Sequence, residues 1–195
     1  MVEIRPVDKS ELLAIRRLHE ESVGDLSSAV ALEWYRENPD LFVGAFDGPE
    51  LVGYCLGRGR SEDLAELHGI GVQDPYTRQG IGTDLLARFE EAAAAGFDGV
   101  TIRSVGGYVD EFYLANGYEP ASVLVRLPAE EVPEEYPREF DVVEEQVVDG
   151  TAKLYVDADG HDPAFLESVR EAFGDPDAVY VMEKRNLDDG SGAIR

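Results

Sequence analysis

The 195-residue sequence has little cysteine and no long apolar run. Cys55 is the single cysteine, which excludes an internal disulfide and every multi-cysteine metal site, and which fits a reducing compartment. No stretch approaches the roughly 18 uninterrupted apolar residues of a membrane helix. The first residues lack the basic start and apolar run of a secretory signal. We therefore expect a cytoplasmic protein that does not enter a membrane.

Basic residues are also scarce, since 41 Asp and Glu stand against 17 Lys and Arg and the formal net charge is −24. Self-repulsion strains such a chain in dilute buffer, whereas about 1 M salt shortens the screening length to about 3 Å. The carboxylates are spread along the chain, so the composition favours adaptation to high salt, as in halophilic cytoplasmic proteins, over recruitment of a basic partner. The lack of a basic stripe argues against nucleic-acid binding.

What the chain does have is a globular composition, with 44% hydrophobic residues and a length that suits one domain with a small appendage. A capping box of Asp8 and Glu11 predicts the start of a first helix. Apolar periodicity and turn residues predict further helices over residues 29–37, 83–95 and 109–116, and strands over 2–7, 41–46, 51–57, 64–72, 99–104 and 118–127. The Asp47-Gly48 turn predicts that the second and third of these strands form an antiparallel hairpin, and Gly96 and Gly117 are expected to end the last two helices.

Proline and glutamate dominate residues 128–139, which indicates a linker. Beyond it, turn residues and periodicity predict a hairpin over 141–148 and 151–156, a helix over 163–173 and a strand over 178–184. The predicted organisation is a domain over 1–127, the linker, a small ββαβ extension over 140–187 and a loose tail over 188–195. The extension carries no catalytic signature, and three roles stay open: covering a sheet edge, forming a homodimer or closing an acceptor site.

A strand, a loop with two glycines and a helix follow one another between residues 64 and 95. Gly69 and Gly71 interrupt the strand, which indicates a bulge or the close approach of another group to its backbone. Loop amides and a helix N-terminus point unsatisfied donors at one place, which is a general way to hold phosphate. An NTPase loop ends in Gly-Lys-Ser/Thr and a dinucleotide loop needs a third glycine, but Thr83 and Leu85 occupy those positions. A plain strand-to-helix turn is the alternative.

Residues 72–86, Val-Gln-Asp-Pro-Tyr-Thr-Arg-Gln-Gly-Ile-Gly-Thr-Asp-Leu-Leu, resemble the coenzyme A signature of the GNAT superfamily of N-acetyltransferases, in which Arg/Gln-x-x-Gly-x-Gly/Ala cradles the pyrophosphate. Residues 112–119, Phe-Tyr-Leu-Ala-Asn-Gly-Tyr-Glu, resemble the Tyr-x-x-x-Gly-Phe segment of that family, with Tyr118 replacing Phe. The resemblance covers residues 2–127. It implies an α/β fold with a mixed, mostly antiparallel central sheet flanked by helices.

The resemblance also implies that acetyl-CoA binds as the acyl donor and that no metal takes part. Thr77 stands where the family has Arg or Gln, and we expect Arg78 or the Thr77 hydroxyl to substitute. A bulged strand around residues 70–72 is expected to aim backbone amides at the acyl carbonyl. The expected cofactor-binding residues are Ile70, Gly71, Val72, Arg78, Gln79, Gly80, Ile81, Gly82, Thr83 and Asn116.

Amine acylation needs proton transfer, because an alkyl ammonium has a pKa near about 10.4 and a departing thiolate benefits from a proton. By the resemblance, Tyr113 is the general acid that protonates the coenzyme A sulfur, with core packing as the alternative. Glu66 matches a position where some members carry a base. His68, two residues on and so on the same face of the strand, competes with it. The absence of any fixed base is the third interpretation.

The expected function is transfer of an acetyl group to a primary amine of a small molecule or peptide by direct attack in a ternary complex. A non-catalytic acyl-CoA-binding or interaction module is the alternative. Trp34 and Tyr35 are candidates to line the acceptor pocket, with plain packing as the other interpretation. Aspartates around His161 suggest a calcium loop, but the segment lacks the Gly and distal Glu spacing of such a loop, which favours a solvated turn.

Overall fold

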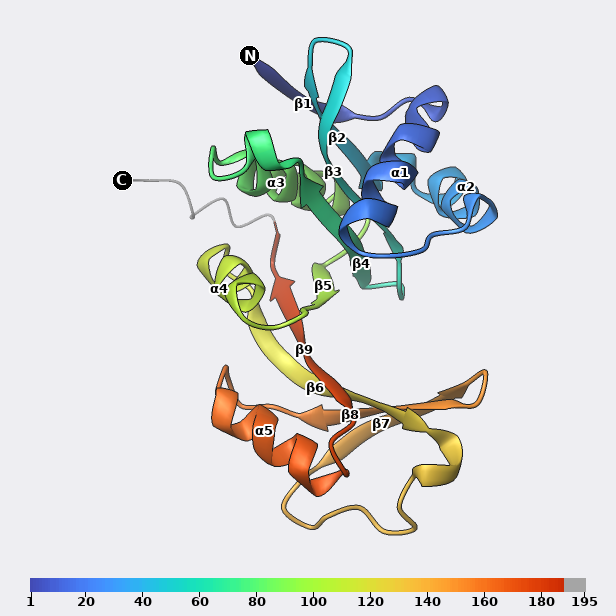
Figure 1. Ribbon diagram of the computed structural model, residues 1–195, viewed down its shortest axis with the longest axis vertical. Coiled ribbons are helices and arrows are strands. Elements are labelled where there is room, and N and C mark those ends of the chain that lie inside the picture. The colour runs from blue at the N-terminus through green and yellow to red at the C-terminus, as the bar shows by residue number, and fades with distance from the viewer. Residues whose placement is uncertain (188–195) are drawn as a thin grey trace. The chain divides into compact units, whose positions relative to one another are not determined.

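The computed structural model describes residues 1–187 (Figure 1). It divides into two compact units, the first formed by Met1–Thr101 with residues 185–187 and the second by Ile102–Lys184. The tail predicted over 188–195 lies outside the described residues. Among residues 1–187, every helix is too short or too polar to cross a bilayer.

The first unit is a four-stranded antiparallel sheet with three helices. Its strands pair in chain order, as the predicted hairpin requires. The strands are β1 (Val2–Pro6), β2 (Phe42–Asp47), β3 (Glu50–Gly59) and β4 (Leu64–Val72), and the helices are α1 (Leu12–Ser22), α2 (Ser28–Glu37) and α3 (Ile81–Ala93). The next strand, β5 (Gly99–Arg103), crosses the division between the units. The predicted capping box is confirmed, because the Asp8 amide donates to Glu11 at 2.7 Å.

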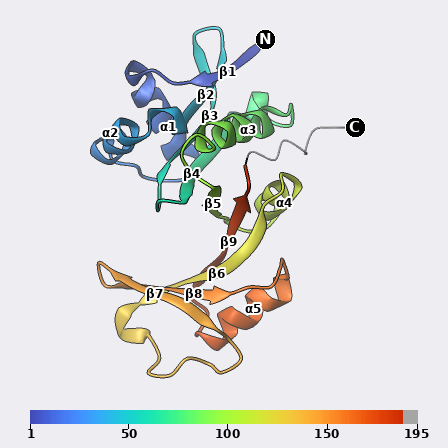
Figure 2. The same ribbon diagram turned by 180° about the vertical axis from the view of Figure 1, so that it is seen from behind.

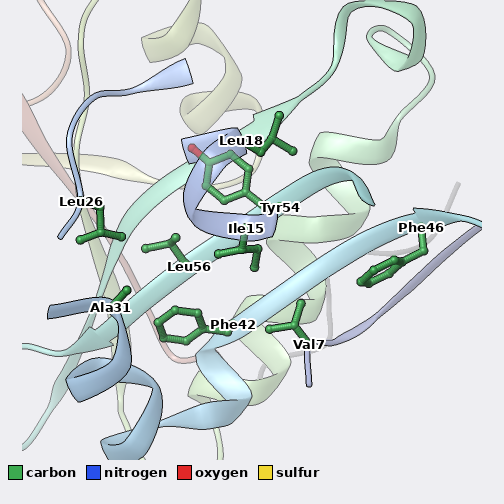
Figure 3. Close-up of a cluster of buried hydrophobic side chains, with 9 residues drawn as sticks. All are labelled: Val7, Ile15, Leu18, Leu26, Ala31, Phe42, Phe46, Tyr54 and Leu56. Carbon is green, nitrogen blue, oxygen red and sulfur yellow. The ribbon is translucent and has the colours of Figure 1, made fainter. Parts of the chain in front are cut away.

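Helices cover both faces of this sheet, with α1 and α2 on one side and α3 on the other (Figures 1 and 2). Side chains of α1, α2, β2 and β3, together with two from the connecting segments, form one buried cluster (Figure 3). Its members are Val7, Ile15, Leu18, Leu26, Ala31, Phe42, Phe46, Tyr54 and Leu56. Burying each large side chain contributes about 1.5–3 kcal/mol, so this cluster fixes the helices against the strands that carry the candidate site.

The pairing of β3 with β4 contains a bulge at His68. Leu56 pairs with Gly69 and Gly57 with Leu67, so His68 is the extra residue, while residues 70–72 keep a regular register with β3. On the side of β4 that pairs with β3, the bulge therefore lies at His68 and not at residues 70–72 as expected. An ideal Cβ on Gly57 would lie 2.2 Å from the Glu66 carbonyl oxygen, so the strands approach at a point that only glycine allows.

The second unit contains the predicted short helix and the ββαβ extension up to Lys184. Its elements are α4 (Tyr108–Ala115), β6 (Glu119–Pro128), β7 (Val142–Val148), β8 (Thr151–Asp157), α5 (Pro163–Ala172) and β9 (Asp177–Arg185). β6 lies between β8 and β9 and is antiparallel to both, and β7 pairs with β8. The last strand of the predicted 1–127 domain is therefore central to the sheet that the extension builds.

α5 lies on one face of this second sheet. Arg170 donates from Nη2 to the Ala178 carbonyl at 2.8 Å, and Leu166 and Val169 are buried. The segment predicted as a linker lies near the end of α5, since the Tyr136 ring lies 6.4 Å from that of Phe173, the C-cap of that helix. The α/β fold with a mostly antiparallel sheet flanked by helices is confirmed.

Candidate active site

Glu66, one of the two candidate bases, lies in β4 with only 3% of its surface exposed. Arg58 of β3 donates from Nε to the Glu66 carboxylate at 3.0 Å. A cation at this distance favours the ionised carboxylate and offsets its burial. The Arg58 guanidinium also lies over the indole of Trp34, 5.0 Å from the ring centroid.

His68, the other candidate, is half-buried beside the same tryptophan. Its ring stands edge-on to Trp34 at 4.7 Å and stacks on His19 of α1 at 5.4 Å. Trp34 therefore contacts the imidazole of one candidate and the cation that binds the other. Tyr35 differs, because its hydroxyl donates to the Val7 carbonyl at 3.1 Å and its ring packs on Phe42.

A buried polar pair beneath His68 was not predicted from the sequence. His19 Nδ1 and the Tyr54 hydroxyl lie 3.0 Å apart, and His19 is 1% exposed. Burial lowers the pKa of His19 and raises the pKa of Tyr54. An ideal Cβ at Gly69 would lie 2.6 Å from the His19 ring, and one at Gly71 would lie 2.7 Å from Tyr54. The glycines of β4, which predicted a close approach, make room for this pair.

The lowered pKa of His19 predicts a pH-dependent stability. The unfolded chain takes up the proton at a higher pH than the folded chain, so stability is complete above about pH 6.5 and falls as the pH drops toward the folded pKa. We expect a slope of at most about 1.4 kcal/mol per pH unit in that window. Chemical denaturation of the wild type and His19→Gln at several pH values, in constant salt, measures it. Equal slopes in the two proteins would remove His19 as the cause.

In the loop between β4 and α3, two residues have a left-handed backbone conformation, and the loop leads into a helix whose first amides have no helical partner. Gly80 has φ +84° and caps α3 without a side chain, and Arg78 has φ +59°, which is costly for any residue except glycine. The Asp84 amide makes the first bond of the helix, to the Gly80 carbonyl at 3.0 Å. The amides of residues 81–83 belong to the first turn, where helical geometry supplies no partner. They present donors and a partial positive charge suited to a phosphate group.

Two polar side chains of this loop stabilise the loop itself. The Thr77 hydroxyl donates to the Asp74 carbonyl at 2.9 Å, and Gln79 donates from Nε2 to the Pro75 carbonyl at 3.0 Å. The Thr77 hydroxyl therefore stabilises the turn after Asp74. Of the two expected substitutes for the family arginine, Arg78 is the one that brings a positive charge.

Tyr113 lies on α4 of the second unit, and Asn116 is the C-cap of that helix. Tyr113 is 2% exposed and packs edge-on against Phe112 at 5.2 Å and Tyr118 at 5.5 Å. Asn116 ends the helix, and its Nδ2 donates to the Phe112 carbonyl at 2.7 Å. The Tyr118 that replaces the usual Phe thus keeps an aromatic contact with the candidate acid.

The remaining candidates have structural roles. Cys55 is buried, and burial raises the pKa of its thiol, which disfavours the nucleophilic thiolate. Asp162 caps α5 by accepting from the Ala164 amide at 2.9 Å. Within residues 1–187, no group of three or more His, Cys, Asp or Glu side chains is arranged to hold a metal ion.

Comparisons with known proteins agree on one family. The profile of the acetyltransferase (GNAT) family matches residues 10–117, more than half of the chain. Mycothiol acetyltransferase of Corynebacterium efficiens is 34% identical over 61 residues, which are 31% of this chain and only 20% of that protein.

Two solved structures share the fold. The ribosomal-protein-S18-alanine N-acetyltransferase of Escherichia coli matches with a TM-score of 0.56 and 15% identity over 100% of both chains. A GNAT family acetyltransferase of Elizabethkingia anophelis with acetyl-CoA bound matches with a TM-score of 0.57 and 13% identity, covering 94% of this chain and 97% of its own. At these identities the likeness supports the shared fold.

Proposed function

Because the chain belongs to the acetyltransferase (GNAT) family, we propose that it transfers the acetyl group of acetyl-CoA to a primary amine by direct attack in a ternary complex. The observation that carries the acetyl-CoA part is the loop before α3, where Gly80 is left-handed and the amides of the first helical turn have no helical partner. Such a loop suits the pyrophosphate of coenzyme A. The acetyl-CoA bound to the Elizabethkingia anophelis protein is consistent with this donor.

We assign the binding of acetyl-CoA to three groups of residues. The backbone of residues 78–83 holds the pyrophosphate, with the Arg78 guanidinium beside it. The backbone of residues 70–72 in β4 lies along the acyl-carrying arm and donates to the thioester carbonyl. Asn116, which ends α4, completes the set. The backbone donors of residues 70–72 and 78–83 are already placed by the strand and the helix start, so they need little reorganisation on binding.

The chemistry requires two proton transfers. A neutral amine attacks the thioester carbonyl, the new C–N bond forms, and the C–S bond breaks as the tetrahedral intermediate collapses. Tyr113 donates a proton to the departing sulfur, and the attacking amine loses one to a base. His68 and Glu66 are the candidate bases, and Trp34, which lies beside both, is a candidate wall of the acceptor pocket.

Other parts of the proposal rest on the sequence. We propose residues 1–127 as the catalytic domain and residues 140–187 as an extension that assists it, alone or in a homodimer. The acceptor is a small molecule or a peptide with a primary amine. We expect neither nucleic acid nor a membrane as partner, since a surface with net charge −24 repels anionic polymers and anionic lipids.

Thiol release from acetyl-CoA, measured at high salt across a panel of amines, tests the function. The panel contains peptide N-termini, lysine, polyamines and free amino acids. Release that depends on one amine class and yields its acetylated product supports the transferase. Tight acetyl-CoA binding without release on any amine would instead support the non-catalytic acyl-CoA-binding module.

The backbone geometry of the loop predicts which variants weaken acetyl-CoA binding. Gly80→Val puts a β-branched residue at φ +84° and should raise the Kd for acetyl-CoA about tenfold, equivalent to about 1.4 kcal/mol. Arg78→Gly relieves the strain at φ +59° and removes one charge, so the loss should be smaller and should vanish in high salt. Calorimetric titration at two salt concentrations measures both. A larger loss for Arg78→Gly would mean that the side chain, and not the backbone, holds the phosphates.

A further inference from the structure

A buried carboxylate fixes the first turn of α4. Asp110 is 4% exposed, accepts from the hydroxyl of the buried Ser104, and lies 2.9 Å from His161 Nε2. The N-cap of α4 is Gly107, which has no side chain to hold the helix start. A buried carboxylate is tolerated only when it is paired, so these two partners are what keep Asp110, and the turn around it, in place.

The histidine partner comes from the extension. His161 lies between β8 and α5, 51 residues from Asp110 along the chain. Tyr180 of β9 holds that segment: its hydroxyl donates to the Asp162 carbonyl at 2.7 Å and accepts from the Asp162 amide at 3.1 Å. The Tyr180 ring also lies 5.0 Å from that of His161. The contacts with Tyr180 therefore fix the position of the His161 imidazole independently of its bond to Asp110.

The contacts close into a ring, because the Ser104 amide donates to the Tyr180 carbonyl at 2.9 Å. Ser104 thus binds both Asp110 of α4 and the strand that positions His161. α4 has eight residues, too few for a helix to be stable on its own, so its position depends on such contacts. The ring joins α4 to the extension through side chains of three separate segments.

Asp110 lies three residues before Tyr113, on the same face of α4. These two are the buried residues of the helix. A shift of the turn at Asp110 would therefore move the Tyr113 hydroxyl, and a displacement of about 1 Å can cost about 10²-fold in rate.

We propose that His161 is a positioning residue, which sets α4 and thereby Tyr113 by holding Asp110, so that the extension acts on catalysis through this one contact. This inference rests on the proposed role of Tyr113 as the general acid. His161 does not touch the reacting atoms in this account. Its effect passes through one hydrogen bond and one short helix.

Three variants separate positioning from plain stabilisation. His161→Ala removes the partner of Asp110, His161→Gln replaces it by an amide donor, and Asp159→Ala changes an exposed residue of the same segment as a control. The measurements are kcat, the KM values for acetyl-CoA and amine, the Tm, and hydrogen exchange of the α4 amides. We expect His161→Ala to lower kcat about tenfold with little change in KM and to speed exchange in α4. His161→Gln should restore most of kcat, and Asp159→Ala should leave every value unchanged.

Two results would overturn the positioning role. One is a His161→Ala protein with a lower Tm but a normal kcat at temperatures below that Tm. The other is an Asp159→Ala protein that loses as much kcat as His161→Ala. If His161→Ala does not fold, Ser104→Ala removes the other partner of Asp110 and must lower kcat and speed α4 exchange, or the proposal fails. Tyr113→Phe separates the two hypotheses. Full turnover in Tyr113→Phe rejects the acid role, whereas exchange in α4 still reports whether His161 holds the helix.

Discussion

Tyr113→Phe should lower kcat by about 10²–10⁴-fold while the Kd for acetyl-CoA stays nearly unchanged. The substitution removes one hydroxyl and keeps the ring, so the edge-on contacts with Phe112 and Tyr118 survive. Without the acid, the sulfur must leave as a thiolate, which raises the barrier for collapse of the tetrahedral intermediate. Steady-state thiol release, with acetyl-CoA titrated separately by calorimetry, measures the two quantities.

Tyr118→Phe is the matched control. Tyr118 is buried next to Tyr113, and the change again removes a single hydroxyl while restoring the family residue. We expect turnover close to that of the wild type. Equal losses in both variants would show that the aromatic pair matters for packing, and normal turnover in Tyr113→Phe would leave the acid unassigned.

Local sequence signals predicted most of the elements. The capping box at Asp8, the Asp47-Gly48 turn and Gly117, which follows α4 with φ +83°, each depend on a few neighbouring residues, and the corresponding elements appear in the structure. Gly96 is the exception, because α3 ends at Ala93 and its C-cap is Ala94. The same holds for the loop after β4, because its two glycines and the following apolar stripe specify a strand–loop–helix locally. Elements that depend on short-range geometry can therefore be predicted from a single sequence.

Contacts between distant segments could not be predicted in this way. Arg58 pairs with Glu66 across a hairpin, His19 meets Tyr54 at a separation of 35 residues, and His161 meets Asp110 at 51. No local pattern links the members of such pairs. The glycines of β4 were the one signal for the His19 pair, since they showed that something approaches the strand but not what it is.

The lack of a local signal for distant contacts also explains why the pairing of the extension with β6 was not predicted. Its ββαβ order followed from local signals, but the return of β9 to β6 is a pairing over a long stretch of chain. That pairing leaves β6 between β8 and β9, so the strand shares its hydrogen bonds with two strands of the extension. An extension bound in this way can act on α4, which a separate appended domain could not do.

His68→Gln should lower kcat/KM by about 10²-fold at neutral pH, the lower end of the range for a general base. His68 is half-buried, so water and an amine can reach it, and an imidazole changes charge near neutral pH. Glu66 is buried and bound to Arg58, which favours its ionised form. We therefore expect Glu66→Gln to act mainly on stability, because it leaves the Arg58 cation beside a neutral amide.

Comparing pH–rate profiles with Tm values for the two variants separates the three interpretations of the base. If His68 is the base, His68→Gln removes the acidic limb of the kcat/KM profile and Glu66→Gln keeps it. If Glu66 accepts the proton through water, Glu66→Gln loses the larger share of kcat/KM at an unchanged Tm. If both variants keep the acidic limb and the wild-type value of kcat/KM, the amine reaches the site already deprotonated. Catalysis then depends on positioning and on the protonation of sulfur by Tyr113.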